Sequence, residues 1–354
     1  MIDVYLGKKE WKNVWKEFIN MIINLWITKQ CNLTCKYCYE KQQFNKYNEV
    51  DKIDDIILWM KKNINDIEKV IFHGGEPLLK FSYIKQIVSE LVAIKSNIMF
   101  GITTNGTIWN NNIRDFFIEY KDNFSSDITV SIDGDKETHD LNRICNGKGT
   151  FKKVLRTSEN LLTIDGNIRA RMTFTPDTIH KLNENIVYLY KIGFRTISSS
   201  FDFTDYRWSE VYIEDVLKEY IKIYNYWNEM ADVNVGIVDE INFNNKLNKC
   251  NCEFNLCLDG IIYPCTFIVG NNNFKIGDIN RGIDYKIINE ITDISFKTNE
   301  KCRDCSNKDY CDSNRCKLMN YSTSGNYYEP NQNICAFESV KNLVRKMVIN
   351  NLCI

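Results

Sequence analysis

Residues 22–39 read IINLWITKQCNLTCKYCY, a short apolar run followed at once by a loop with three closely spaced cysteines. The apolar run is typical of a buried β-strand, so the loop begins where that strand ends. Cys31, Cys35 and Cys38 place three thiolates within eight residues. Such a set can hold one face of an iron–sulfur cluster and leave one iron open to a small molecule. The alternatives are a zinc knuckle, for which no fourth Cys or His follows in the loop, and three buried free thiols.

After this loop, short apolar segments alternate with helical segments as far as Phe201. The expected strands are Ile22–Thr28, Val70–His73, Ile98–Thr103, Ile128–Ile132, Ile168–Phe174 and Thr196–Phe201. The expected helices are Asp51–Lys62, Tyr83–Lys95, Asn111–Lys121, Lys152–Leu162 and Ile179–Lys191. Because parallel neighbours need a crossover helix, six such repeats predict an α/β protein with a parallel sheet. The sheet closes partly into a barrel or stays open, and in both cases reactive groups belong at the carboxyl ends of its strands.

The pattern changes after the last of these strands. Residues 208–230 predict one long helix, and beyond residue 249 the chain is rich in cysteine, with short hairpin-like segments between turns. We therefore expect three parts, namely an N-terminal helix in residues 1–21, a core in residues 22–240 and a cysteine-rich α+β domain in residues 241–354.

Composition restricts the class of protein. The chain has 45 Lys and Arg against 46 Asp and Glu, a balance that predicts no nucleic-acid partner and no polybasic membrane anchor. No run approaches the ~18 apolar residues of a membrane span, and the N-terminus does not resemble a signal peptide. We therefore expect a cytoplasmic protein without a membrane partner. In a reducing compartment its 14 cysteines indicate metal binding rather than disulfides.

The cysteine loop resembles the signature of the radical S-adenosylmethionine (SAM) superfamily, Cys-x3-Cys-x2-Cys followed by an aromatic residue, here Tyr39. Three further motifs of this superfamily fall in the right order at expected strand ends, at 73–77 (HGGEP), 103–106 (TTNG) and 131–134 (SIDG). Paired glycines let a backbone approach a ligand closely, and a glutamate supplies a carboxylate for a cation. The resemblance covers about residues 22–200 and implies a partial (β/α)6 TIM-like barrel.

The resemblance also implies the roles of individual residues. Cys31, Cys35 and Cys38 would form the catalytic centre by holding a [4Fe–4S] cluster to which SAM binds. Arg143 lies in a segment similar to that of peptide-modifying members, in which the arginine reaches the cofactor; a surface salt bridge is the alternative. The residues implied to bind SAM are Tyr39, Gly74, Gly75, Glu76, Pro77, Thr104, Asn105, Ser131, Asp133 and Arg143.

The C-terminal cysteines resemble the SPASM (twitch) pattern, with one extra residue between Cys311 and Cys316. The resemblance implies two auxiliary [4Fe–4S] clusters. The cysteines of the outer cluster would be Cys302, Cys305, Cys311 and Cys335, and those of the inner cluster Cys250, Cys265 and Cys316. The fourth inner ligand stays open between Cys252, Cys257 and a substrate thiolate, and a zinc ribbon is the alternative for residues 302–316.

By this resemblance the protein cleaves SAM reductively to a 5′-deoxyadenosyl radical and modifies a peptide or protein, with ferredoxin or flavodoxin as reductant. Two activities compete, the crosslinking of a ribosomally synthesised cysteine-containing peptide and the maturation of anaerobic sulfatases to formylglycine. Sulfatase-maturating enzymes carry an Asp where this chain has Thr266, which cannot act as a base near neutral pH, so we favour crosslinking. Few residues precede the first strand, so a separate leader-binding protein is a further expected partner. A non-catalytic multi-cluster electron carrier is the alternative of a different class.

Overall fold

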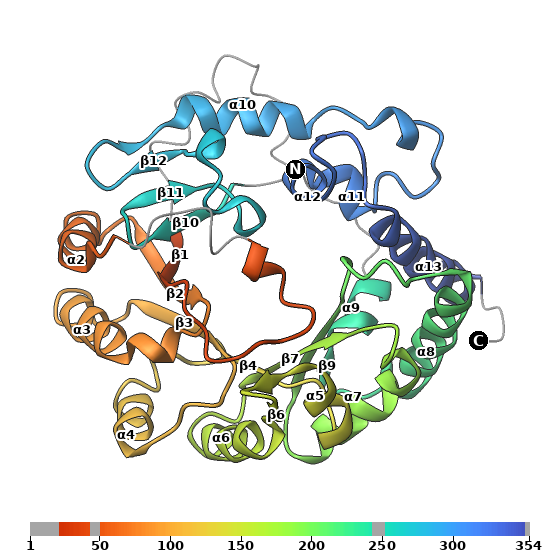
Figure 1. Ribbon diagram of the computed structural model, residues 1–354, viewed down its shortest axis with the longest axis horizontal. Coiled ribbons are helices and arrows are strands. Elements are labelled where there is room, and N and C mark those ends of the chain that lie inside the picture. Colours follow the sequence, from red (N-terminus) through yellow and green to blue (C-terminus); the bar gives the residue numbers. More distant parts are fainter. Residues whose placement is uncertain (1–20, 43–49, 243–251, 351–354) are drawn as a thin grey trace.

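The computed structural model describes residues 21–42, 50–242 and 252–350. The expected N-terminal helix lies outside these residues, and Met21 already belongs to the first strand. Within the described residues, eleven strands form one sheet in the order β13-β12-β11-β10-β1-β2-β3-β4-β7-β8-β9. The strands curve around the middle of the molecule and most helices lie on the outer side (Figure 1). This is the predicted partial barrel.

The parallel part of the sheet confirms all six expected strands. These are β1 (Met21–Thr28), β2 (Ile67–Gly74), β3 (Met99–Thr104), β4 (Ile128–Ser131), β7 (Arg169–Phe174) and β8 (Thr196–Phe201). The sequence did not predict the short outer strand β9 (Asn234–Val235) or the β5–β6 hairpin (Ile144–Cys145 with Lys148–Gly149). Two-residue strands carry no periodic signal, which explains these omissions.

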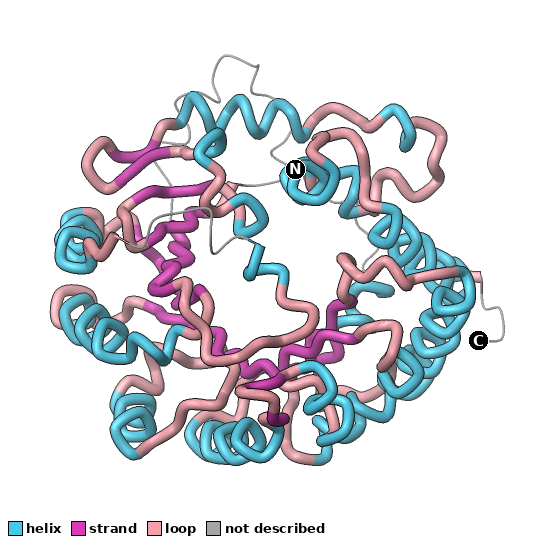
Figure 2. The backbone as a smooth tube through the Cα atoms, in the orientation of Figure 1, coloured by secondary structure: helices cyan, strands magenta, loops and turns pink. Residues whose placement is uncertain are grey.

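The helices of the core lie outside the sheet, as Figure 2 shows by colour. They are α2 (Ile53–Lys62), α3 (Phe81–Val92), α4 (Asn111–Glu119), α5 (Lys136–Asn142), α6 (Phe151–Ile164), α7 (Leu182–Lys191), α8 (Glu210–Trp227) and α9 (Gly236–Asn242). In α6, Phe151, Val154, Ser158 and Leu161 are buried at three- and four-residue spacing, so one face of the helix packs on the sheet. The expected helices, including the long one at α8, are confirmed. No helix in the described residues is long and apolar enough to cross a bilayer.

Strand β1 shows why the sheet is buried on both faces. Its alternate residues Ile23, Leu25 and Ile27 are fully buried in the main core. On the opposite face Trp26 is also fully buried, in a small separate cluster with Cys257, Tyr263 and Val269. A parallel strand covered on both sides reads as a continuous apolar run, which is the run seen at the start of the sequence.

The C-terminal region extends the same sheet. Strand β10 (Phe254–Cys257) lies parallel to β1, and β11 (Ile261–Tyr263), β12 (Gly277–Asp278) and β13 (Gly282–Ile283) follow antiparallel. The helices of this region are α10 (Tyr285–Ser295), α11 (Asp312–Arg315), α12 (Lys317–Ser324) and α13 (Gln332–Ile349). The domain division near residue 240 stays a proposal, since that residue lies within α9 and the sheet continues through β10.

Helix α13 is the main correction to the sequence prediction, which gave only short hairpin-like segments here. Its residues Ile334, Phe337, Val340 and Val344 are buried at helical spacing. Phe337 stacks on Phe201 at the end of β8, with ring centroids 3.6 Å apart. The aromatic contact therefore joins the C-terminal region to the carboxyl edge of the barrel.

We expect Phe337→Ala to lower the free energy of unfolding by about 3–5 kcal/mol, because it removes a fully buried ring from this contact. Leu343→Ala on the same helix is the matched control, since Leu343 is 45% exposed and should change the free energy by less than about 1 kcal/mol. Urea unfolding followed by fluorescence measures both. Equal losses in the two variants would contradict the proposed junction.

Candidate functional site

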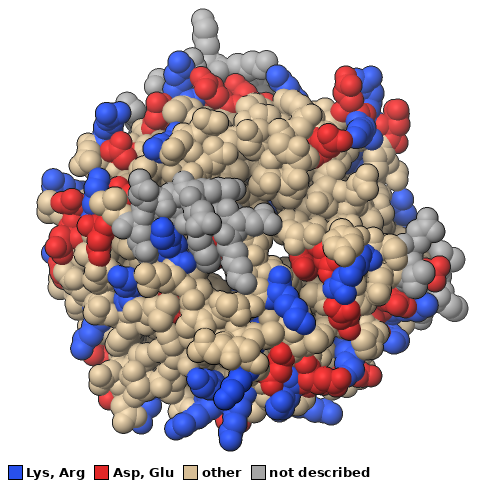
Figure 3. Space-filling view, in the orientation of Figure 1, with Lys and Arg blue, Asp and Glu red and all other residues tan. Residues whose placement is uncertain are grey.

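A cavity of about 600 Å³ lies at the carboxyl ends of the barrel strands. Cys31, Cys35 and Cys38 all line it, so the structure brings the three predicted thiols to one space. The other predicted site residues on its wall are Tyr39, Gly74, Gly75, Thr104, Asn105, Ser131 and Arg143. In the space-filling view a hollow is visible near the middle of this face, with acidic and basic side chains interspersed around it (Figure 3).

Backbone hydrogen bonds to another segment of the chain hold the cysteine loop in place. Thr34 N donates to Ile144 O (2.7 Å) and Lys36 N donates to Asn142 O (3.1 Å), which ties the loop to the segment after α5. Burial raises the pKa of the Cys31 thiol to about 11, although Leu33 N donates to its sulfur. Because a metal binds the thiolate, metal binding to Cys31 must displace a proton that this thiol holds more tightly than an ordinary cysteine does.

The Gly-Gly turn after β2 lies against this loop. Gly75 N donates to Thr28 O (2.9 Å), and Glu76 N donates to Gln30 O (2.8 Å). A Cβ on Gly74 would lie 2.1 Å from Thr28 O, and one on Gly75 would lie 2.2 Å from Gln30 O. Gly74 also has a φ of +123°. Only glycines permit this approach, and they leave a cradle of bare backbone on the cavity wall.

Glu76 lies behind the wall rather than on it. Its fully buried carboxylate accepts hydrogen bonds from Thr104 Oγ1 (2.7 Å), Asn105 N (2.7 Å) and Leu78 N (3.1 Å). Burial raises its pKa to about 7, while these hydrogen bonds oppose the shift. Pro77 starts a short 3₁₀ helix (Pro77–Lys80) next to it, and it is buried as well.

Arg143 forms a buried ion pair. Its guanidinium donates two hydrogen bonds of 3.0 Å to the carboxylate of Asp133, which also contacts the hydroxyl of Tyr37. Arg143 is 6% exposed and lines the cavity, whereas Asp133 is 1% exposed and lies behind it. The alternative of a surface salt bridge is therefore wrong. A buried pair with two parallel hydrogen bonds fixes the guanidinium in place.

The two histidines near the cavity are neutral at pH 7. Burial lowers the pKa of both His73 and His139 to about 4. His73 Nδ1 accepts a hydrogen bond from Gly74 N, so this ring nitrogen carries no proton. The distance of 3.6 Å between His73 Nδ1 and Glu40 Oε1 is therefore not that of an ion pair. Burial also raises the pKa of Glu40 to about 8. His73 packs against Trp26 and accepts a hydrogen bond from Gly74 N.

The C-terminal thiols form two groups. Cys265 and Cys316 are close enough to interact electrostatically, as are Cys302, Cys305 and Cys335. Cys311 interacts electrostatically with Cys335 and therefore belongs to the second group. Cys250 lies outside the described residues, and among those described no three His, Cys, Asp or Glu side chains converge enough to hold a single metal ion.

The two candidates for a further inner ligand differ. Cys257 is fully buried in β10, and burial holds its pKa well above the ordinary value. Cys252 is partly buried, with a pKa raised to about 11 by burial. Neither lines the cavity as the structure describes it.

Buried polar groups surround the second thiol group. Asn299 Nδ2 lies 3.6 Å from Cys302 Sγ, and the side chain of Ser313 has no hydrogen-bond partner within the described residues although it is buried. Lys317, directly after Cys316, is 1% exposed. Burial lowers the pKa of its ammonium, and Cys302, Cys311 and Cys316 oppose that shift. This donor-rich setting fits negatively charged sulfur better than free thiols.

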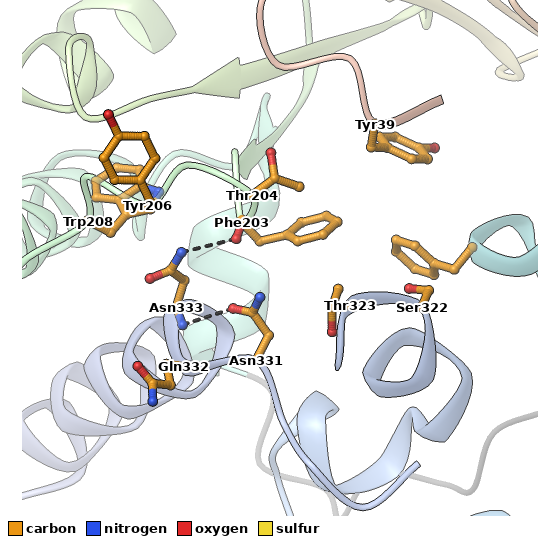
Figure 4. Close-up of a pocket in the computed structure, with 11 residues that line it drawn as sticks. Tyr39, Phe203, Thr204, Tyr206, Trp208, Ser322, Thr323, Asn331, Gln332 and Asn333 are labelled. Carbon is orange, nitrogen blue, oxygen red and sulfur yellow. Dashed lines mark hydrogen bonds between the residues drawn. The ribbon is translucent and has the colours of Figure 1, made fainter. Parts of the chain in front are cut away.

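A second pocket, of about 560 Å³, opens at the rim of the cavity (Figure 4). The two spaces share Tyr39, Phe203, Thr204 and Phe267. Asn333, at the start of α13, donates to Phe203 O (3.0 Å) and so fixes the loop after β8 to the C-terminal region. None of the described side chains that line this pocket is charged; beyond the shared four they are Tyr206, Trp208, Ser322, Thr323, Asn331, Gln332 and Asn333.

Sequence reasoning missed the far wall of the cavity. It is formed by polar residues of β7 and β8 and by residues of α8, α9 and α13, among them Arg169, Arg171, Thr173, Ser198, Ser200, Asp202, Tyr220, Glu240, Glu338 and Lys341. The alternation of polar and apolar residues in Arg169–Phe174 was the available signal, because a strand covered on both faces needs polar residues only where it lines a cavity.

Comparison with known proteins agrees with this geometry. The model of the Radical SAM superfamily matches residues 27–201. The cysteine-type anaerobic sulfatase-maturating enzyme of Clostridium novyi (strain NT) is 24% identical over 317 residues, which cover 79% of this chain and 83% of that protein. An uncharacterized protein of Methanocaldococcus jannaschii is 30% identical over 174 residues, which cover 49% of this chain and 59% of that protein.

Two solved structures have the same fold. Native anSMEcpe with bound AdoMet superimposes with a TM-score of 0.72 at 22% identity, over 94% of this chain and 100% of that one. SuiB of Streptococcus suis bound to its precursor peptide SuiA superimposes with a TM-score of 0.62 at 16% identity, over 90% of this chain and 76% of that one.

Residues 27–201 are a radical SAM domain. The protein is therefore an enzyme, and the electron-carrier alternative is wrong. The family implies a [4Fe–4S] cluster and SAM as cofactors. The thiols on the cavity wall and the bare backbone cradle at Gly74 and Gly75 fit these groups.

We expect Gly75→Ala to displace the cysteine loop, because the added Cβ would meet Gln30 O at 2.2 Å. The variant should retain less iron after anaerobic reconstitution and unfold more easily by at least about 2 kcal/mol. Gly166→Ala is the control, since nothing lies within 4 Å of a Cβ there. Iron counting and urea unfolding test both, and full iron retention by Gly75→Ala would argue against the close contact.

Proposed function

We propose that the protein cleaves SAM at a [4Fe–4S] cluster held by Cys31, Cys35 and Cys38 and uses the reaction to crosslink a ribosomally synthesised, cysteine-containing peptide. The observation that carries the proposal is the shared cavity. Its wall combines the three thiols, the glycine cradle and residues of α13, and it opens into the uncharged rim pocket. A site of this shape accommodates both a small cofactor and a longer chain.

In this proposal SAM lies against the cradle. When bound, the cluster and SAM supply reductive cleavage to methionine and a 5′-deoxyadenosyl radical. The backbone of Gly74 and Gly75 lets the cofactor approach closely, and Arg143 presents a fixed positive charge to its carboxylate. Glu76, whose carboxylate lies buried behind this turn, would attract the SAM amino group electrostatically, and its hydrogen bonds from Thr104 and Asn105 hold that carboxylate in position.

Two auxiliary [4Fe–4S] clusters complete the proposed cofactor set. Cys302, Cys305, Cys311 and Cys335 would hold the outer one, and Cys250, Cys265 and Cys316 the inner one. The electrostatic proximity within each group of described thiols supports this division. The complete burial of Cys257 argues against it as a ligand, which leaves Cys252 or a substrate thiolate for the fourth inner position.

The rim pocket is the proposed entrance for the peptide. Its amide and hydroxyl side chains can bond a peptide backbone, and its aromatic rings can pack on uncharged side chains. Among structural neighbours, SuiB has been solved with the precursor peptide SuiA and anSMEcpe with the Cp18Cys peptide. We place the reaction in the cytoplasm, with ferredoxin or flavodoxin as reductant and a separate leader-binding protein as a further partner.

The choice between the two candidate products depends on which group removes a proton from the peptide. Either oxidation takes one hydrogen atom, one proton and one electron from the peptide, so a base is needed. Thr266, directly after Cys265, stands where sulfatase-maturating enzymes carry an Asp and cannot act as their base, which favours crosslinking with a base at another position. The second candidate, formylglycine formation, is supported by the similarity to the sulfatase-maturating enzyme of Clostridium novyi along most of both chains.

We expect the affinity for SAM to rise with pH between about 6 and 7.5, because the SAM ammonium favours the ionised form of Glu76, whose pKa is about 7. Glu76→Gln should weaken binding about 10- to 100-fold and remove this rise. Glu68→Gln, at an exposed position on the preceding strand β2, is the control. Equilibrium binding to the reconstituted enzyme measures the effect, and an unchanged rise in the Gln variant would sink the assignment.

The function itself is tested by anaerobic reconstitution followed by a dithionite assay for 5′-deoxyadenosine. Wild type should bind about twelve irons and cleave SAM, while Cys35→Ala should retain about eight irons and cleave none. Two peptides then decide the product by mass spectrometry, the Cp18Cys peptide and the product of any short cysteine-rich reading frame beside the gene. Loss of two hydrogens with sulfur retained indicates a crosslink, whereas loss of two hydrogens together with exchange of sulfur for oxygen indicates formylglycine. Absence of SAM cleavage by wild type would refute both.

A further inference from the structure

Among the described residues, Lys317 is a buried cation without a carboxylate partner. It is the first residue of α12 and is 1% exposed. Its Nζ donates to Asn299 Oδ1 and to Asn314 O (2.6 Å), and it lies 5.5 Å from the centroid of the Tyr328 ring. In the described part of the chain these hydrogen-bond acceptors are neutral. A lysine is almost never fully buried unless an anion compensates its charge.

The nearby groups that can become anionic are sulfurs. Cys302, Cys311 and Cys316 interact electrostatically with Lys317, and Asn299 connects the ammonium to Cys302 through its own amide, 3.6 Å from the sulfur. Cys316 belongs to the proposed inner cluster, while Cys302 and Cys311 belong to the outer one. Lys317 therefore interacts with thiols of both groups.

The surrounding polar groups point to the same conclusion independently. The backbone N–H groups of Ser313 and Asn314 donate to Cys311. The buried hydroxyl of Ser313 has no partner among the described residues, although leaving a buried hydroxyl unsatisfied is unfavourable. Donors gathered around sulfur in this way stabilise negative charge on it.

We propose that Lys317 is the buried counter-cation of the auxiliary clusters and raises their reduction potential. The inference rests on the proposed auxiliary clusters. Each added electron makes a thiolate-bound cluster more negative, and a fixed positive charge in a medium of low dielectric constant stabilises that state most. Lys317 thereby makes the clusters better acceptors for the electron that the peptide gives up. Lys317 lines neither the cavity nor the rim pocket, so in this proposal it acts through the clusters.

The test is a redox titration of the reconstituted enzyme, followed by electron paramagnetic resonance, with iron counted in each sample. Lys317→Met removes the charge and the hydrogen bonds, and Lys317→Gln removes the charge but keeps a donor. Lys301→Met is the control, because Lys301 is next to Cys302 but exposed and paired with Glu329. Both Lys317 variants should shift the auxiliary potentials to more negative values, and the control should leave them at the wild-type values.

Wild-type potentials in Lys317→Gln would overturn the proposal, since hydrogen bonding rather than charge would then suffice. Where the Met and Gln variants lose auxiliary iron altogether, Lys317→Arg decides: retention shows that the charge is required, and loss overturns it. If the wild-type protein binds no auxiliary iron after reconstitution, the proposal is overturned, because it rests on those clusters. Failure of the proposed function is distinguished by the dithionite assay, because SAM cleavage at the first cluster does not depend on Lys317.

Discussion

The contact between the Gly-Gly turn and the loop after β1 is the constraint on which the site depends. Two backbone hydrogen bonds, from Gly75 N to Thr28 O and from Glu76 N to Gln30 O, hold the end of β2 against the start of the cysteine loop. No side chain fits between these segments. The cysteines are therefore placed by rigid sheet geometry rather than by a mobile loop, and the same turn buries Glu76 beside the strand end of β3. One close approach of backbone fixes both the thiols and the carboxylate.

The second constraint is the continuity of the sheet into the C-terminal region. Strand β10 pairs with β1 in register, Trp26 opposite Cys257, so this region is aligned with the barrel strand that precedes the cysteine loop. On the other side Phe337 stacks on Phe201. With attachment at both edges, the region completes the ring of elements between β1 and β8 (Figure 1). That is the arrangement in which groups held by the C-terminal cysteines stay at a constant distance from the cavity.

The sequence predicted the elements whose signal is local. The six parallel strands β1, β2, β3, β4, β7 and β8 are short segments with buried apolar residues, and the thiols, the two glycines and Arg143 that the motifs pointed to all line one cavity. The pairing of β10 with β1 was not predictable, because it joins residues more than two hundred positions apart and depends on packing. The burial of Asp133 behind Arg143 likewise depends on how α5 turns back on β4. Helix α13 did carry a periodic signal, at Ile334, Phe337, Val340 and Val344, which the nearby cysteines obscured.

The ionisable groups around the cavity explain why such a site is costly for the fold. The pKa of Glu76 is raised to about 7 and that of Glu40 to about 8, mainly by burial. Both groups therefore favour the folded state most below their ordinary pKa, and stability falls as the pH rises through 7 and 8. A bound cation reverses this trend, because it stabilises the ionised carboxylate in the folded state alone. The buried ammonium of Lys317 is likewise unfavourable for folding, but its charge is positive and an anion would compensate it. Each buried charge is unfavourable by itself and becomes favourable when a ligand of complementary charge binds. Binding and folding are therefore thermodynamically linked both at the cavity and beside the C-terminal thiols.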